Sequence, residues 1–87
     1  MRLKYEFEMM EIDNETIAIP IGTNSQSFKG VIKLNETGAK IFELIKEGRN
    51  LESIIDDMRF LYPENVDDIP AYVYEFVDNL KKDGVLE

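Results

Sequence analysis

Residues 28–45, FKGVIKLNETGAKIFELI, contain the change of hydrophobic period that decides the fold. Up to Leu34 the apolar residues alternate with other residues, as they do in a β-strand that is buried on one face. After Asn35 they recur every three or four positions, as in an amphipathic helix. Asn35 is a good N-cap, and Glu36 falls in the first helical turn, where negative charge is favourable. This stretch predicts a third strand over residues 28–34 that leads directly into a first helix.

The sequence before this stretch predicts a β-hairpin. Residues 5–9 alternate apolar and acidic side chains, residues 16–21 are rich in β-branched residues, and Asp13-Asn14 between them are turn formers. The alternation breaks at Met9-Met10, which suggests a β-bulge at that point. Pro20 has no N–H to donate, so we expect it at a sheet edge or near the end of its strand.

The sequence after Gly48 predicts two more helices. Gly48 and Gly84 stand where a left-handed residue closes a helix, Asn50 can cap the second helix, and Asp67 or Asp68 can cap the third. The second helix has an apolar stripe of Leu51, Ile54, Ile55, Met58 and Leu61. The third has Ile69, Val73, Phe76 and Leu80 as its main stripe, with Val77 on one flank, and Val85-Leu86 should fold back onto the core. The prediction is one α+β domain over residues 1–87, with a three-stranded antiparallel sheet followed by three α-helices.

The composition removes many kinds of active site. The 87 residues include no cysteine and no histidine, which excludes disulfides, thiolate and imidazole metal sites and histidine-based acid–base catalysis. The sequence contains no apolar run of membrane-spanning length and begins without a secretory signal. We therefore expect a cytoplasmic, non-enzymatic protein with no catalytic residues, no metal, no cofactor and no membrane partner.

The negative charge is concentrated in the helical half. The net charge is −8, and residues 50–87 alone hold 3 basic and 10 acidic side chains, a net of −7. A solvated helical surface explains this pattern. The same charge would repel a phosphate backbone and attract a basic stretch of a peptide.

The order of strands before helices leaves the third strand at a sheet edge beside the last helix. Such an edge can accept an extended peptide, whose main-chain hydrogen bonds give affinity and whose alternate side chains give specificity. Gly30, without a Cβ, would permit close approach. The groove would lie between Val31 and Lys33 on the strand and apolar residues of the third helix. The predicted peptide-binding residues are Lys29, Gly30, Val31, Ile32, Lys33, Leu34, Ile69, Tyr72, Val73 and Phe76.

From Val31-Ile32-Lys33-Leu34-Asn35 onward the chain resembles the PqqD family, whose members are also called RiPP recognition elements. The similarity rests on that strand, on Ala39 and the Ile41–Leu44–Ile45 helix closed by Gly48, on a second helix around residues 51–55, and on a third ending in residues 76–86. It covers about residues 28–86. The resemblance implies a winged-helix-like fold. It also implies a peptide chaperone that holds the leader of a ribosomally made precursor peptide as an added strand. Such a protein presents the leader to a radical SAM enzyme or a leader protease, and in the founding case the pathway makes pyrroloquinoline quinone.

Three other interpretations stay open at this stage. A winged helix can bind DNA, although the second and third helices here are acidic. Glu52-Ser53-Ile54 faintly matches an acidic carrier protein with a prosthetic group on Ser53, although an ordinary first-turn serine explains it as well. The free third strand could also pair with a second copy of the chain, which would give a homodimer and mask the edge. Each predicted site side chain could instead serve the core or protect the edge.

Overall fold

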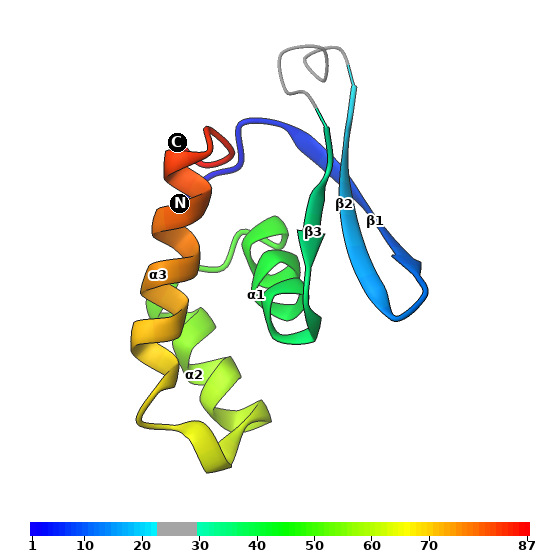
Figure 1. Cartoon of the computed structure of the whole chain (residues 1–87). Coiled ribbons are helices and arrows are strands. Elements are labelled where there is room, and N and C mark those ends of the chain that lie inside the picture. The colour runs from blue at the N-terminus through cyan, green and yellow to red at the C-terminus, as the bar shows by residue number, and fades with distance from the viewer. Residues whose placement is uncertain (23–29) are drawn as a thin grey trace.

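The computed structural model describes residues 1–22 and 30–87 (Figure 1). Three strands come first, β1 (Glu6–Ile12), β2 (Glu15–Ile21) and β3 (Ile32–Leu34). The helices follow as α1 (Glu36–Lys46), α2 (Leu51–Leu61), a single 3₁₀ turn η2 (Pro63–Asn65), and α3 (Ile69–Lys82). This order confirms the predicted α+β fold, an antiparallel three-stranded sheet followed by three α-helices.

The hairpin of β1 and β2 is regular and has no bulge, so the expectation of one at Met9-Met10 was wrong. Pairing runs without interruption from Glu6 opposite Ile21 to Ile12 opposite Glu15. The two turn residues, Asp13 and Asn14, both have positive φ, 50° and 67°, as a tight two-residue hairpin turn requires. The alternation breaks at Met9-Met10 for another reason: the two methionines lie on opposite faces of the sheet, and both faces are apolar at this point.

β2 is the middle strand, and β3 covers only its first half. Thr16, Ile17 and Ala18 of β2 face Leu34, Lys33 and Ile32 of β3. Pro20 lies beyond this paired segment, near the end of its strand as expected, so its missing N–H costs no bond to β3. β3 is also shorter than the strand predicted over residues 28–34. Phe28 and Lys29 lie outside the described residues, and Gly30 precedes β3 with a φ of 96° that favours glycine.

The helix ends follow the predicted capping signals in most cases. The side-chain oxygens of Asn35 and Asn50 accept hydrogen bonds from the backbone N–H groups of Gly38 and Ser53, which caps α1 and α2. Gly48, with a φ of 83°, follows α1 in the left-handed region. Asp68 stands at the N-cap of α3 but makes no side-chain capping bond.

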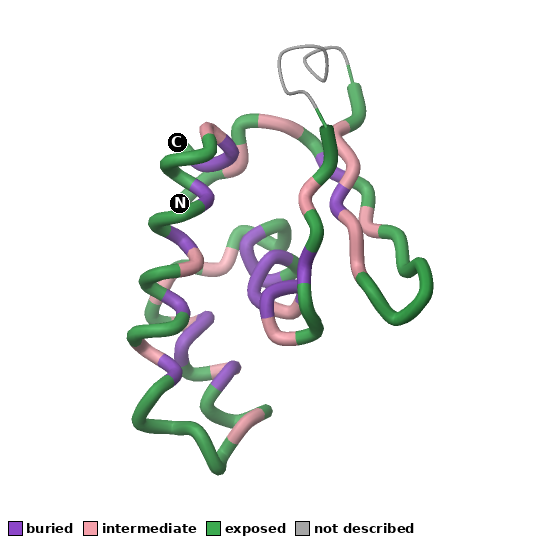
Figure 2. Tube along the Cα trace, viewed as in Figure 1, coloured by how far each residue is buried: buried purple, intermediate pink, exposed green. Residues whose placement is uncertain are grey.

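The core lies between the inner face of the sheet and the three helices, and Figure 2 shows its residues as one buried stripe per helix. Phe7 of β1 packs edge-on against Phe42 of α1, with ring centroids 5.3 Å apart. Two details differ from the prediction. Val77 rather than Phe76 belongs to the fully buried stripe of α3, and Leu61 is 46% exposed because it is the last residue of α2.

The N-terminal and C-terminal segments of the chain pair with each other. Leu3 and Leu86 form an isolated antiparallel bridge, and the Lys4 N–H donates to the Val85 carbonyl over 2.9 Å. Val85 and Leu86 are fully buried, as the sequence predicted. Among the described residues, no helix is long and apolar enough to span a bilayer.

Candidate functional site

The outer edge of β3 is the first component of the candidate site. The sheet order is β1-β2-β3, so β3 pairs with β2 on one side, and no strand of the described residues pairs with its other side. In any strand, alternate residues direct their N–H and C=O groups to opposite sides. The outer edge of β3 therefore offers unpaired backbone donors and acceptors to an extended chain.

The side chains of β3 divide between the two faces of the sheet. Ile32 and Leu34 face the helices, since Leu34 is buried in the core and Ile32 packs against it. Lys33 lies between them on the opposite face and is exposed, and Val31, one residue before β3, is 47% exposed. By this alternation Val31 and Lys33 lie on the face away from α3. The structure therefore does not place them in one groove with the helix residues, and β3 contributes its backbone edge and Ile32 on the helix side.

β3 and α3 come together at the first turn of α1. Asn35 directly follows β3, and its Oδ1 accepts hydrogen bonds from the Gly38 N–H at 2.7 Å and from the Tyr72 hydroxyl at 3.4 Å. A Cβ on Gly38 would lie 2.9 Å from Cε2 of Phe76, so the glycine lets that ring lie directly on the helix. Two predicted site residues of α3, Tyr72 and Phe76, thus contact the segment into which β3 runs.

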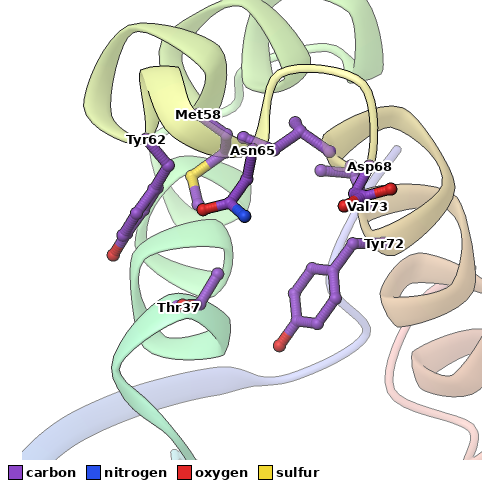
Figure 3. Close-up of a pocket in the computed structure, with 8 residues that line it drawn as sticks. Thr37, Met58, Tyr62, Asn65, Asp68, Tyr72 and Val73 are labelled. Carbon is purple, nitrogen blue, oxygen red and sulfur yellow. The ribbon is translucent and has the colours of Figure 1, made fainter.

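A pocket of about 200 Å³ opens beside this junction (Figure 3). It lies between the start of α1, the end of α2 and the start of α3. Ile69 and Val73 are buried and form its wall, while Tyr72 is 38% exposed and stands at its margin. Phe76 and the residues of β3 do not line it. The lining residues are Thr37, Met58, Tyr62, Asn65, Asp68, Ile69, Tyr72 and Val73.

Five of these lining residues were not predicted as site residues from the sequence, namely Thr37, Met58, Tyr62, Asn65 and Asp68. Met58 was assigned to the core stripe of α2, where it is indeed buried. The others stand at helix ends, which carry no periodic signal. One clue was available: Tyr62 is an aromatic residue just before Pro63, a position where the helix stops and its last side chains surround the next loop.

The chemistry of the pocket suits binding of an apolar side chain. Aliphatic and thioether side chains line it together with two tyrosines, Asn65 and Asp68. Concave, mostly apolar sites with a few polar groups are typical of ligand anchors. Within residues 1–22 and 30–87, no group of three or more acidic residues is arranged to hold a metal ion.

Ser53, the position of the carrier-protein interpretation, has a structural role. Its hydroxyl accepts a hydrogen bond of 2.8 Å from Nε of Arg49, and its N–H is bound by the Asn50 cap. Arg49 also forms an ion pair of 2.8 Å with Asp57. These contacts join the α1–α2 connection to α2 and explain the serine without a prosthetic group.

Comparison with known proteins gives a family and a fold. The family model for "Coenzyme PQQ synthesis protein D (PqqD)" matches residues 10–86. No curated protein matches the chain. A solved structure described as "TbiB1 in Complex with the TbiA(beta) Leader Peptide" superposes with a TM-score of 0.79 at 22% identity, covering 100% of this chain and 95% of that one. That likeness shows that the two chains share a fold.

Proposed function

The chain belongs to the PqqD family, and on this premise we propose that it binds the leader of a ribosomally made precursor peptide. The leader adds to β3 as a further strand and is presented to a modifying enzyme, such as a radical SAM protein, or to a leader protease. The chain itself performs no chemistry in this function. A structure of the same fold is described as a complex with a leader peptide, which supports the proposal.

One observation carries the proposal: the free edge of β3 ends at Asn35, where the Tyr72 side chain at the margin of the pocket makes contact. A peptide paired with β3 can therefore continue toward the pocket without leaving the surface. At about 3.3 Å per residue, the three residues of β3 would pair with about three residues of the leader. The next apolar side chain of the leader is the natural occupant of the pocket.

The expected energetics give the anchor more weight than the edge. Each main-chain hydrogen bond contributes about 1 kcal/mol net, and ordering one residue of a free peptide costs about 1–2 kcal/mol. For a leader that only pairs with β3, the free energy gained from main-chain hydrogen bonds would therefore be nearly cancelled by the entropy cost of ordering the peptide. Burial of a large apolar side chain contributes about 1.5–3 kcal/mol, so anchor side chains decide the affinity.

The direct test is an amide NMR titration of the chain with a synthetic leader of a candidate precursor sought among the neighbouring genes. We expect shifts to concentrate at residues 30–35 and in the first two turns of α3. Shifts confined to α2 and the hairpin turn would contradict strand addition. Absence of any shift at millimolar peptide would contradict leader binding to the isolated chain.

A matched pair of tyrosine variants tests the pocket. Tyr72 and Tyr74 are both exposed residues of α3, at 38% and 56%, but only Tyr72 lines the pocket. We expect Tyr72→Ala to weaken leader binding about tenfold or more, as loss of an aromatic anchor does. Tyr74→Ala should leave the dissociation constant within about twofold of the parent. Equal effects of the two substitutions would exclude the pocket as the anchor site.

A further inference from the structure

Lys33 lies on the face of the sheet that the helices do not cover. Its neighbours in β3, Ile32 and Leu34, face the core, whereas Lys33 alternates with them and is exposed. The strand pairing places Lys33 opposite Ile17 of β2, which in turn lies opposite Met10 of β1. Lys33 is therefore the last side chain in a row across the outer face of the sheet. The next place in this row belongs to any strand that pairs with the free edge of β3.

The ammonium group of Lys33 has no acidic partner in the part of the chain that the structure describes. No ion pair among residues 1–22 and 30–87 includes Lys33. The residue directly opposite, Ile17, is apolar. Glu15 lies on the same face but diagonally across from Lys33, at a spacing of roughly 7–8 Å between the two strands. A positive charge therefore stands at the free edge of β3, where an added strand would meet it first.

We propose that Lys33 selects leaders in which an acidic residue, aspartate or glutamate, stands between two apolar residues. The inference rests on the proposed function, since it takes the leader to pair with β3, and it adds the chemical class of the leader. Residues directly opposite each other in paired strands project to the same face, with Cβ atoms about 4.5–5.5 Å apart. The leader residue opposite Lys33 therefore lies on the outer face, and its two neighbours face the helices, on the side of Ile32 and Leu34.

Cross-strand electrostatics favours an acidic residue opposite Lys33. Opposite charges in a directly opposed pair stabilise a sheet, and like charges destabilise it. The pair is exposed to solvent, so its effect on leader affinity should be about two- to fivefold. The apolar residues on either side are favoured by the inner face, where the leader covers the half-buried Ile32. The leader is thus recognised from both faces of the sheet, by apolar contacts on one and by charge on the other.

A lysine at a sheet edge can also protect the edge from unwanted strand pairing. That role predicts a different result when Lys33 is replaced. A protecting lysine opposes every added strand, so its removal should strengthen the binding of all leaders alike. A selecting lysine changes the affinity only between leaders that differ at the residue opposite it. The test therefore has to vary the leader as well as the chain.

The test exchanges charges between Lys33 and the leader. The probes are synthetic forms of the leader that shifts the amides of residues 30–35, with glutamate, glutamine or lysine placed at each position of its paired segment in turn. Fluorescence anisotropy gives their dissociation constants for the parent chain, Lys33→Gln and Lys33→Glu. The matched control is Lys81→Glu, the same charge change at an exposed lysine of α3 about two and a half turns beyond Tyr72. Circular dichroism of each variant checks that the fold is intact.

At one leader position we expect the parent chain to bind the glutamate form about two- to fivefold more tightly than the glutamine form, and the lysine form most weakly. Lys33→Gln should remove this difference, and Lys33→Glu should reverse it, so that the lysine form binds most tightly. The preference should shrink as the salt concentration rises from about 0.05 to 0.5 M, because the pair is exposed. Lys81→Glu should keep the preference of the parent at that position.

Three results would overturn the inference: no leader position at which the glutamate and glutamine forms differ, a preference that Lys33→Glu leaves unchanged, or equal tightening of all leader forms by Lys33→Gln. The last would assign Lys33 to protection of the edge. In each case the unmodified leader still binds the parent chain, and the proposed function stands. Failure of the proposed function would appear separately, as the absence of amide shifts when the parent chain is titrated with that leader.

Discussion

At the scale of single residues, Gly38 leaves room for the Phe76 ring of α3 against the first turn of α1. A Cβ at this position would meet Cε2 of Phe76 at 2.9 Å and Oδ1 of Asn35 at 3.0 Å. In an unconstrained helix Gly→Ala stabilises by about 0.5–1 kcal/mol. Here the contact should outweigh that gain, because overpacking typically costs about 1–3 kcal/mol. We predict that Gly38→Ala lowers the free energy of unfolding by about 1 kcal/mol in urea denaturation.

The double variant Gly38→Ala/Phe76→Leu is the control for this prediction. If the clash is with the ring, the smaller side chain should recover part of the loss, and the two substitutions will not add. A stabilising Gly38→Ala would mean that the ring moves aside at no cost, and the close approach of α3 would then have no energetic weight.

Asn35 links helix capping to the candidate site, and Asn50 offers the matched comparison. Both side chains accept a hydrogen bond from the N–H three residues on, at 2.7 and 2.8 Å, but only Asn35 also meets Tyr72. We predict that Asn35→Ala and Asn50→Ala each lower the unfolding free energy by about 1 kcal/mol. Only Asn35→Ala should also weaken leader binding. Equal effects on leader binding would argue that the Asn35–Tyr72 contact does not organise the site.

At the scale of elements, the sequence predicted what depends on periodicity and end signals. The three strands, the three helices and the asparagine caps all follow from such local patterns, and the structure has them. Faces were harder to predict than elements: Met9-Met10 suggested a bulge because a strand with two apolar faces has no clean alternation. The pocket itself was not predicted, although Ile69, Tyr72 and Val73 were among the predicted peptide-binding residues. Helix ends from α1 and α2 form the rest of it, and tertiary packing alone brings Thr37 and Tyr62 together.

At this scale we predict that leader binding protects the amides of β3 from hydrogen exchange. Because its outer edge is unpaired among the described residues, the N–H groups of Ile32–Leu34 that point outward should exchange with solvent readily in the free chain. Saturating leader should slow their hydrogen exchange about tenfold or more, since each gains a main-chain bond. β1 serves as the internal control, because it is the opposite edge of the sheet. Protection that rises equally in β1 and β3 would indicate general stabilisation rather than strand addition.

At the scale of the whole molecule, the N-terminal and C-terminal segments contact each other, and the C-terminal segment contributes to the core. Leu86 is 2% exposed and bridges to Leu3, and the Glu87 N–H donates to the Arg2 carbonyl over 2.9 Å. We predict that Leu86→Ala costs about 2–5 kcal/mol, the usual range for truncating a buried leucine. Leu61→Ala, at a site 46% exposed, is the matched control and should cost less than about 1 kcal/mol. Thermal or urea unfolding distinguishes the two, and equal losses would place Leu86 outside the cooperative core.

The charge of the whole molecule should select among leaders. Residues 50–87 carry a net charge of −7, and Asp68 lines the pocket. A leader with basic residues near its anchor should therefore bind more weakly as ionic strength rises from about 0.05 to 0.5 M, because salt screens the attraction. Asp68→Asn should weaken that leader about two- to fivefold at low salt and reduce its salt dependence. Asp78→Asn is the control. Asp78 lies ten residues after Asp68 in the sequence, and its carboxylate already forms an ion pair of 3.2 Å with Lys82. A leader affinity independent of salt would show that the acidic half serves solubility and not recognition.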